Sequence, residues 1–317
     1  MDKKDEKNLN DIKNFLDKNE IDYNIGSSNF CLWYNNPDGK RMYEIEYVPS
    51  KEYPVSYPKY NIEGVDKDYF FNLSYEAEHN NSFKLWIKDF EWNDPNKKEV
   101  LKSYILHEAD KTPNKFYARD CVVVKINSRE ARLFEKRNCF YGERGASLNL
   151  GLCLKKTKNG LPPGTLLMLY TFGKNFFGKK NDIIEVIRVG TIKFSYVIGG
   201  SSKLLKHFTR NYKRIKIGKN IIKVKHLKFY SDYDHNLGSS MNKLEFEFVG
   251  YSGGGFINYW VEENKIKQRS PMNHKWVMEQ MQKGRVLAIP NAGVKTFIMN
   301  LPEIKDEEEK KLDLFFV

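Results

Sequence analysis

Two α/β domains make up the fold that this 317-residue sequence predicts. Three observations lead to it: helix-like and strand-like runs alternate along the chain, the composition changes near residue 112, and the sign of the charge changes there too. Hydrophobic residues make up 40% and charged residues 30%, a composition typical of globular proteins. We therefore expect one domain over residues 1–112 and a second over 113–317, with a C-terminal extension over 261–317.

In the first domain a turn signal, Pro37–Lys40, stands between two strand-like runs. The expected elements are a helix over 9–19, strands over 30–36 and 41–49, a helix over 66–79, a strand over 83–92 and a helix over 96–107. This order suits a small α/β layer fold.

The second domain is expected to open with a strand and a helix for which Ser128 is the N-cap residue. The strands are expected over 119–126, 147–155, 166–172, 183–189, 224–230, 245–251, 256–262, 286–290 and 294–300, and the helices over 128–137, 203–212 and 274–283. An acidic segment ends the chain, and we expect it to be frayed.

Charge is divided unequally between the two parts. Residues 1–112 carry 16 basic and 22 acidic side chains, whereas residues 113–317 carry 37 and 19. No acidic residue occurs from Val186 to Ser231. A surface for a polyanion, most of all double-stranded DNA, is predicted there. Its candidate contacts are Lys203, Lys206, Arg210, Lys213, Arg214, Lys216, Lys219 and Lys223.

Cysteine spacing and hydropathy argue against other classes. None of the four cysteines forms a Cys-x-x-Cys pair, which argues against a zinc site built from cysteines. No apolar run approaches the roughly 20 residues that cross a membrane, and the N-terminus lacks the apolar core of a secretory signal. We expect a cytoplasmic protein with no membrane partner.

A glycine-serine turn lies between a predicted strand and a predicted helix. It consists of Gly199, Gly200, Ser201 and Ser202, followed by Lys203. Glycine lets backbone N–H groups approach a ligand, and the start of a helix favours an anion such as pyrophosphate. A plain turn is the alternative interpretation of the same residues.

The downstream segment sharpens this prediction: with Lys243, Phe246 and Gly250 it resembles the GNAT family of N-acetyltransferases. In that family a glycine-bearing loop and helix hold the pyrophosphate of CoA, and a later segment completes the fold. Lys243, Phe246 and Gly250 fit the later segment, whereas Glu245 stands where the family has glycine. A GNAT-like mixed sheet, with an opening at Gly199–Ser202, is what the resemblance implies for the second domain.

Residues 117–260 are more narrowly similar to the Mom-type DNA-modification proteins of bacteriophages. The matching positions are Phe172, Gly173, Glu185, Arg188, Ser201, Ser202, Asp232, His235, Gly238 and Gly250. Ser231 departs from the order of the family motif. The resemblance implies a phage-type protein, located in the host cytoplasm, that modifies a nucleobase with acetyl-CoA or a related acyl-CoA.

Acyl transfer to an amine needs a group that takes up the amine proton. Asp232 and His235 lie three positions apart in a polar loop after a strand, where exposed site residues commonly occur. The alternative is that Asp232 and Asp234 cap the next helix and that His235 is an ordinary surface residue. Glu185 and Arg188 are either site residues or an ion pair.

The whole chain resembles phage homing endonucleases in which a Vsr-like nuclease domain precedes a GNAT-like domain. The resemblance is carried by Glu46 in a hairpin, by Asp89–Trp92 at the expected end of a strand, and by a linker with Thr112–Asn114 and Ala118–Arg119. It implies a Mg²⁺-dependent endonuclease with Glu44 and Glu46 as metal ligands. The first hairpin strand lacks the family's Asp, and Tyr57 and Tyr60 stand where a Tyr-His pair is expected, so we expect a domain that has lost cleavage. A catalytically inactive DNA-binding protein is a third possibility.

Aromatic side chains also occur among the cations. Phe176, Phe177 and Tyr212 lie beside Lys174, Lys179, Lys180, Lys213 and Arg214. Such an arrangement either stacks extruded bases or packs under a lysine-rich rim.

Overall fold

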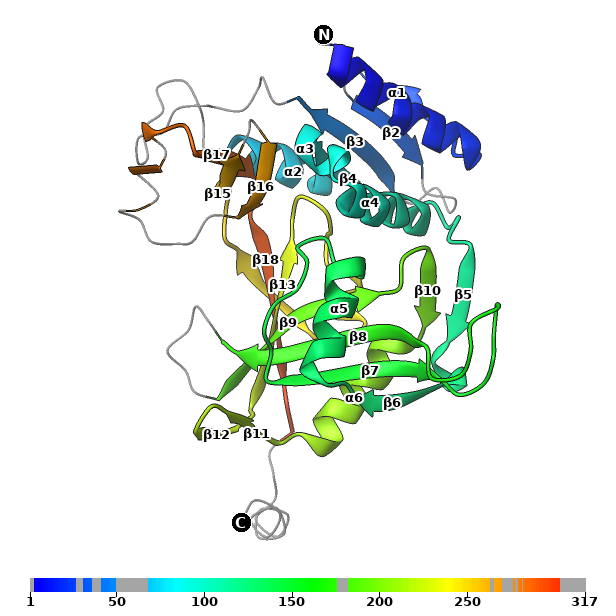
Figure 1. Cartoon of the computed structure of the whole chain (residues 1–317), viewed down its shortest axis with the longest axis vertical. Coiled ribbons are helices and arrows are strands. Elements are labelled where there is room, and N and C mark those ends of the chain that lie inside the picture. The colour runs from blue at the N-terminus through cyan, green and yellow to red at the C-terminus, as the bar shows by residue number, and fades with distance from the viewer. Residues whose placement is uncertain are drawn as a thin grey trace. The chain divides into compact units, whose positions relative to one another are not determined.

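The computed structural model describes residues 3–26, 31–35, 41–49, 68–175, 182–262, 265–269, 276, 279–280 and 282–302. It has a mixed α/β fold, as predicted (Figure 1). The chain divides into two compact units. Unit 1 comprises Met1–Lys111, Ser231–Gly238 and Gly250–Lys295, and unit 2 comprises Thr112–Tyr230, Ser239–Val249 and Thr296–Val317.

The first change of unit, between Lys111 and Thr112, falls where the sequence places its boundary. The second domain expected over 113–317 is not continuous, however, because the chain returns twice to unit 1. The segment Ser231–Gly238 belongs to unit 1 because its backbone bonds there. Trp86 N donates to the Asp234 carbonyl at 3.0 Å, and Tyr233 N donates to the Gly293 carbonyl at 3.0 Å. Pairing between residues so far apart in the chain is not visible in a composition profile.

Unit 1 contains a four-stranded sheet with the order β1-β2-β3-β4. Its elements are α1 (Lys3–Lys18), β1 (Asn24–Ile25), β2 (Cys31–Asn35), β3 (Met42–Val48), α2 (Tyr69–His79), β4 (Ser82–Lys88), α3 (Asp89–Asn93) and α4 (Pro95–Glu108). Strands β3 and β4 are parallel, and the other pairs are antiparallel. A second sheet, with the order β16-β15-β17, is formed by β15 (Gly255–Glu262), β16 (Lys265–Arg269) and β17 (Val286–Asn291).

The alternation of side chains along β3 sets which residues enter the core of unit 1. Tyr43, Ile45 and Tyr47 are buried, and the side-chain amide of Asn8 in α1 donates to the Tyr47 hydroxyl at 3.0 Å. Successive side chains of a strand point to opposite faces. Glu44 and Glu46 therefore lie on the other face of β3.

The strand expected over residues 83–92 is shorter in the structure. Strand β4 ends at Lys88, and Asp89–Asn93 forms the helix α3. The Glu91 carboxylate turns back and accepts a hydrogen bond from the Lys88 backbone N–H at 3.1 Å, which fixes the first turn of the helix. The expectation that Asp89–Trp92 ends a strand was wrong, because this local cap competes successfully with strand propensity.

Unit 2 is built on a seven-stranded sheet with the order β14-β18-β13-β9-β8-β7-β6, in which β13 and β9 are parallel. The seven strands are β6 (Cys121–Lys125), β7 (Leu148–Leu154), β8 (Leu166–Lys174), β9 (Ile183–Thr191), β13 (His226–Asp232), β14 (Glu247–Tyr251) and β18 (Val294–Asn300). The other elements are β5 (Asn114–Tyr117), the short 3-10 helix Ala118–Asp120, α5 (Ser128–Asn138), β10 (Ser195–Ile198), α6 (Gly200–Asn211), β11 (Arg214–Ile217), β12 (Asn220–Lys223) and α7 (Ser239–Asn242). Strands β5 and β10 pair in parallel, and β11 and β12 form a hairpin.

Helices α5 and α6 cover opposite faces of this sheet (Figure 1). Leu204 and Phe208 of α6 join the larger core cluster with Tyr170 of β8. Phe134 of α5 packs against Leu169 on the other face of the same strand. Ser128 is not the N-cap of α5 as expected: the Asn127 side chain accepts from Glu130 N at 2.9 Å. An Asn one position earlier supplies the carbonyl oxygen in the geometry that a cap requires.

Some expectations fall on residues outside the described part of the chain. These are half of the helix expected over 274–283, the acidic C-terminal segment, Tyr57, Tyr60, Phe176, Phe177, Lys179 and Lys180. Within the described residues, no helix has the combined length and apolar character that a membrane crossing needs.

Candidate functional site

The first turn of α6 contains the glycine-serine turn that the sequence predicts to hold a ligand. The helix begins at Gly200, three residues before the expected start, and Gly199 is its N-cap with a left-handed φ of 73°. Lys203 N is the first amide to bond within the helix, to the Gly199 carbonyl at 3.0 Å. Among the described residues, the backbone N–H groups of Gly200, Ser201 and Ser202 have no acceptor. These donors point along a helix whose dipole favours an anion.

Lys203 does not extend this group of donors. Its ammonium donates to the carbonyls of Ala118 at 2.8 Å and Cys121 at 2.7 Å. The side chain thus links α6 to the start of β6. The structure gives Lys203 a structural role, although the sequence suggested both cofactor and nucleic-acid contacts for it.

A buried hydroxyl lies beside the same turn. Tyr170 on β8 is 2% exposed, and the Ser201 side chain lies beside its hydroxyl. Burial raises the pKa of Tyr170 to about 12, and the Ser201 side chain opposes this rise. Tyr170 and Ser201 therefore bring two hydroxyl groups together at the start of α6.

The parallel strands β9 and β13 separate partway along their length. They pair from Ile183 with His226 to Val186 with Phe229, although β9 continues to Thr191. Where the pairing of two strands ends, their backbone N–H and C=O groups no longer bond to each other and can bond to a ligand. Sequence reasoning placed the opening at the glycine turn, and the pairing pattern adds this separation.

Glu185 and Arg188 are both on β9, but their described contacts are different. Glu185 is 5% exposed. Arg188 donates through Nε to the Gly142 carbonyl at 3.2 Å and through Nη1 to the Ile187 carbonyl at 2.9 Å. Arg188 thereby holds the loop after α5. A direct substrate contact for either residue stays a prediction.

The carboxylate of Glu135 on α5 is a feature that sequence reasoning missed. It is fully buried and accepts from Thr171 Oγ1 at 3.0 Å and from Arg144 N at 2.8 Å. Burial raises its pKa above the usual value for Glu. Nothing in the sequence signals this burial, because a Glu on a helix is usually exposed and only the tertiary packing buries Glu135.

In unit 1, Asp232 and His235 lie together as the sequence predicted. His235 Nδ1 is 2.5 Å from Asp232 Oδ2, and His235 Nε2 is 3.8 Å from Glu91 Oε2. Burial alone would lower the pKa of His235, but the two carboxylates outweigh it and raise the pKa to about 9. His235 is therefore a buried cation at neutral pH and not a ready proton acceptor.

Lys88 and Asp234 add two further charged side chains to this buried cluster. Lys88 Nζ bonds Asp234 Oδ2 at 2.6 Å, and the other Asp234 oxygen accepts from Ala292 N at 2.6 Å. Burial raises the pKa of Glu91, but the charges of Lys88 and His235 lower it more strongly. The pKa falls to about 2. Both side chains of the Lys88–Asp234 pair are no more than 3% exposed, so the pair fixes the loop rather than capping the next helix.

Ser231 also has a local role. Its hydroxyl donates to the Asn236 carbonyl at 3.0 Å and is buried. The hydrogen bond holds the turn that carries Asp232 and His235. Of Ser231, Asp232 and His235, only Asp232 is not buried, with 22% of its side chain exposed.

The departure at Glu245 from the GNAT pattern has a structural counterpart. Glu245 adopts a left-handed φ of 66°. Phe246 N donates to the Met241 carbonyl at 3.1 Å and Glu245 N to the Asn242 carbonyl at 3.3 Å. This is the Schellman arrangement after α7, in which glycine is the usual residue at the position of Glu245.

The two predicted metal-binding carboxylates of unit 1 are both held by a lysine. Lys84 Nζ on β4 lies 2.5 Å from Glu44 Oε2 and 3.4 Å from Glu46 Oε2. Ser82 Oγ also donates to Glu44, at 2.8 Å. No group of three or more potential metal ligands occurs in the part of the chain that the structure describes.

The basic segment is divided between α6 and the hairpin β11–β12. Lys206, Arg210, Lys216, Lys219 and Lys223 are exposed, and Lys213 and Arg214 are half-buried. Tyr212 is half-buried and stacks on Phe208 with centroids 5.8 Å apart. Of the two roles expected for the aromatic side chains, base stacking or packing under the cations, Tyr212 has the second.

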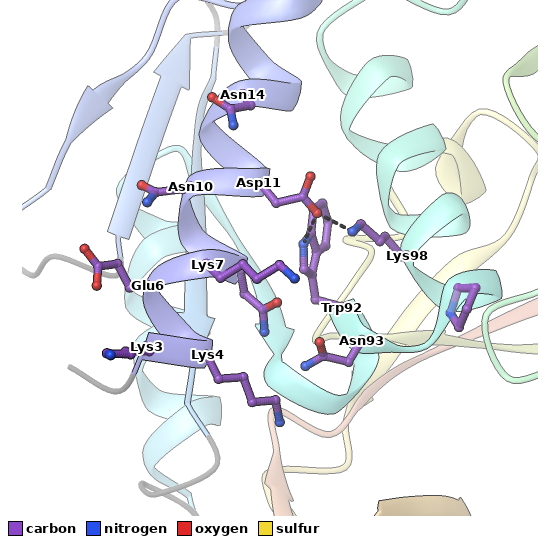
Figure 2. Close-up of a pocket in the computed structure, with 12 residues that line it drawn as sticks. Lys3, Lys4, Glu6, Lys7, Asn10, Asp11, Asn14, Trp92, Asn93 and Lys98 are labelled. Atoms are coloured by element: carbon purple, nitrogen blue, oxygen red, sulfur yellow. Dashed lines mark hydrogen bonds and ion pairs between the residues drawn. The ribbon is translucent and has the colours of Figure 1, made fainter.

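A polar groove of about 880 Å³ in unit 1 was not foreseen from the sequence. Figure 2 shows Asp11 of α1 between Trp92 and Lys98. Trp92 Nε1 donates to Asp11 Oδ2 at 3.1 Å, and Lys98 forms an ion pair with the same oxygen. The floor of the groove is thus internally neutralised, while Lys3 and Lys7 remain exposed on α1.

Comparison with known proteins does not assign the chain to a family. No protein-family model matches it. Among curated proteins no match is found either. The functional conclusion therefore depends on the geometry above.

Proposed function

We propose that the protein acts on DNA as a Mom-like acyltransferase that uses acetyl-CoA or a related acyl-CoA to modify a nucleobase. The observation that carries the proposal is the start of α6. There, three backbone N–H groups without described acceptors follow a left-handed glycine cap. An anion such as the pyrophosphate of CoA satisfies this need for acceptors.

The surroundings of the turn fit the same ligand. Ser201 and Ser202 supply hydroxyl groups, and the buried Tyr170 hydroxyl lies beside Ser201. A bound acyl thioester would supply an acyl carbon that bonds to a base amine as the C–S bond breaks and the thiol leaves. The parting of β9 and β13 supports a ligand lying along the sheet, as in the GNAT family that the sequence resembles.

The family resemblance assigns proton transfer to Asp232, which belongs to unit 1, whereas α6 belongs to unit 2. An amine must lose a proton as it is acylated, and the group that accepts it has to be unprotonated. His235 is held as a cation between Asp232 and Glu91 and does not meet that condition. Asp232 has 22% of its side chain exposed, and its contact with His235 Nδ1 at 2.5 Å fixes its orientation.

The experiment is titration calorimetry with acetyl-CoA on the parent protein and on Ser202→Asp. A carboxylate in the first turn stabilises a helix but repels an anionic ligand. We expect affinity to fall at least tenfold while the melting temperature holds or rises. Asn211→Asp, at the last turn of the same helix, is the charge-matched control and should bind like the parent.

Absence of binding at millimolar acetyl-CoA would remove the enzymatic proposal. Equal affinity for parent and Ser202→Asp would place the ligand elsewhere. Activity is read separately by incubating duplex DNA with labelled acetyl-CoA and testing digested nucleosides for the label, which Asp232→Asn should reduce strongly.

A second candidate function, a metal-dependent endonuclease, is favoured by one specific observation. Glu44 and Glu46 share a face of β3 with Lys84 between their carboxylates. Paired carboxylates with a lysine can hold a divalent cation and stabilise a developing negative charge. The ion pairs must rearrange before a metal can enter.

This candidate is tested by incubating supercoiled plasmid with Mg²⁺ or Mn²⁺. Nicking that disappears in Glu46→Ala and persists in Glu99→Ala, which removes a half-buried ion pair on α4, would support it. A plasmid that stays intact after prolonged incubation counts against cleavage and leaves the acyltransferase proposal unaffected.

A further inference from the structure

The hairpin β11–β12 has one apolar and one cationic face. Ile215 is 5% exposed, and Ile217 and Ile222 pack against the same core. Register pairs Arg214 with Lys223 and Lys216 with Ile221. Because alternate residues share a face, these four side chains form the outward face of the hairpin.

Ile221 is the one apolar residue among the four side chains of that face. It is 49% exposed, and its cross-strand partner is the exposed Lys216. The turn places exposed Lys219 at the tip of the hairpin. A surface that contacted phosphates alone would need no isoleucine among its cations.

The backbone gives the hairpin a defined shape. Gly218 has a φ of 61° and is the first residue of the two-residue turn that it forms with Lys219. Turns of this type match the right-handed twist of a two-stranded ribbon. Such a ribbon fits the major groove of B-form DNA, where base edges include the thymine methyl group.

We infer that the β11–β12 hairpin lies in the major groove of duplex DNA, with Lys216 and Lys219 near phosphates or guanine edges and Ile221 against a thymine methyl. This inference rests on the proposed action on DNA and names how the duplex is held. It differs from a general basic surface in requiring one apolar contact with a base.

The test compares binding of a mixed-sequence 30-base-pair duplex made with thymine and the same duplex made with uracil. Removing the methyl group should weaken binding by the parent about two- to fourfold. Ile221→Ala should bind both duplexes alike, because it has lost the partner of the methyl. Asn220→Ala, exposed on the same strand but on the other face, should keep the parent's preference.

Each outcome decides the inference. Equal binding of both duplexes by the parent overturns it, as does a preference that Ile221→Ala retains, since DNA shape would then be the cause. Tighter binding to an RNA duplex also overturns it, because the major groove of A-form RNA is too narrow for side chains. No binding to duplex DNA removes both the inference and the DNA part of the proposed function, whereas loss of acetyl-CoA binding alone leaves the inference standing.

Discussion

His235 shows how strongly one residue's chemistry depends on its neighbours. Its side chain is 3% exposed and lies between the carboxylates of Asp232 and Glu91. The pKa of about 9 in the folded protein exceeds the ordinary value near 6.5. A group with a raised folded pKa stabilises the fold fully below its unfolded pKa, and the stabilisation is lost as the pH rises through the folded value.

We expect the free energy of unfolding to fall by about 3 kcal/mol between pH 6 and pH 9.5 through this residue. The measurement is urea unfolding at both pH values for the parent and His235→Gln, whose pH dependence should be flatter by that amount. His79→Gln, an exposed histidine of the same unit, serves as the control. Identical pH profiles for parent and His235→Gln would show that the cation contributes nothing.

Glu245 offers a second test at the residue scale. Its left-handed φ of 66° strains a side chain with a Cβ, and its position in the Schellman arrangement usually holds glycine. Glu245→Gly should raise the free energy of unfolding by about 0.5–1 kcal/mol. Glu247→Gly, within β14, should lower it by a similar amount because glycine weakens a strand. A destabilised Glu245→Gly protein would mean that the Glu side chain has a favourable contact that outweighs the strain.

At the scale of elements, helix ends depend on single side chains that propensity does not identify. Helix α5 is capped by Asn127, although Ser128 is an equally good cap residue by type. Asn127→Ala should cost about 1 kcal/mol of stability, because the Glu130 N–H loses its acceptor. Ser128→Ala should stay within about 0.5 kcal/mol. Thermal unfolding of both variants separates the two assignments, and a larger loss for Ser128→Ala would reverse them.

At the scale of the whole molecule, charge is the property most open to measurement. Exposed cations of unit 2 include Lys206, Arg210 and Lys219, all within a stretch that has no acidic residue. If about six phosphates are neutralised, log affinity for DNA should fall against log salt with a slope near −5. Replacing these three residues by Ser should flatten the slope by about 3 and weaken binding to all sequences alike.

A triple variant in unit 1 provides the matched control. Lys7, Lys18 and Lys283 are exposed there, and their replacement by Ser removes the same charge. The salt slope should then change little. Equal effects of the two triple variants, or a salt-independent affinity, would indicate that net charge and not a surface on unit 2 determines binding.

Local sequence alone determined most helices and strands of this protein. The amphipathic period of α6 and the turn at Gly199–Gly200 are properties of residues that are neighbours in the chain, so they can be predicted without a fold. The same holds for the alternation that puts Glu44 and Glu46 on one face of β3. The change of composition near residue 112 likewise coincides with the change of unit at Lys111.

Tertiary structure decided which of those residues are available for chemistry. Lys88 and Asp234 are 146 positions apart and form a buried ion pair, while Glu91 reaches the imidazole of His235. Lys203 turns to two carbonyls, and Lys84 joins two carboxylates. The physical reason is that protonation and bonding of a polar side chain follow from burial and from the charges around it, and long-range packing sets both.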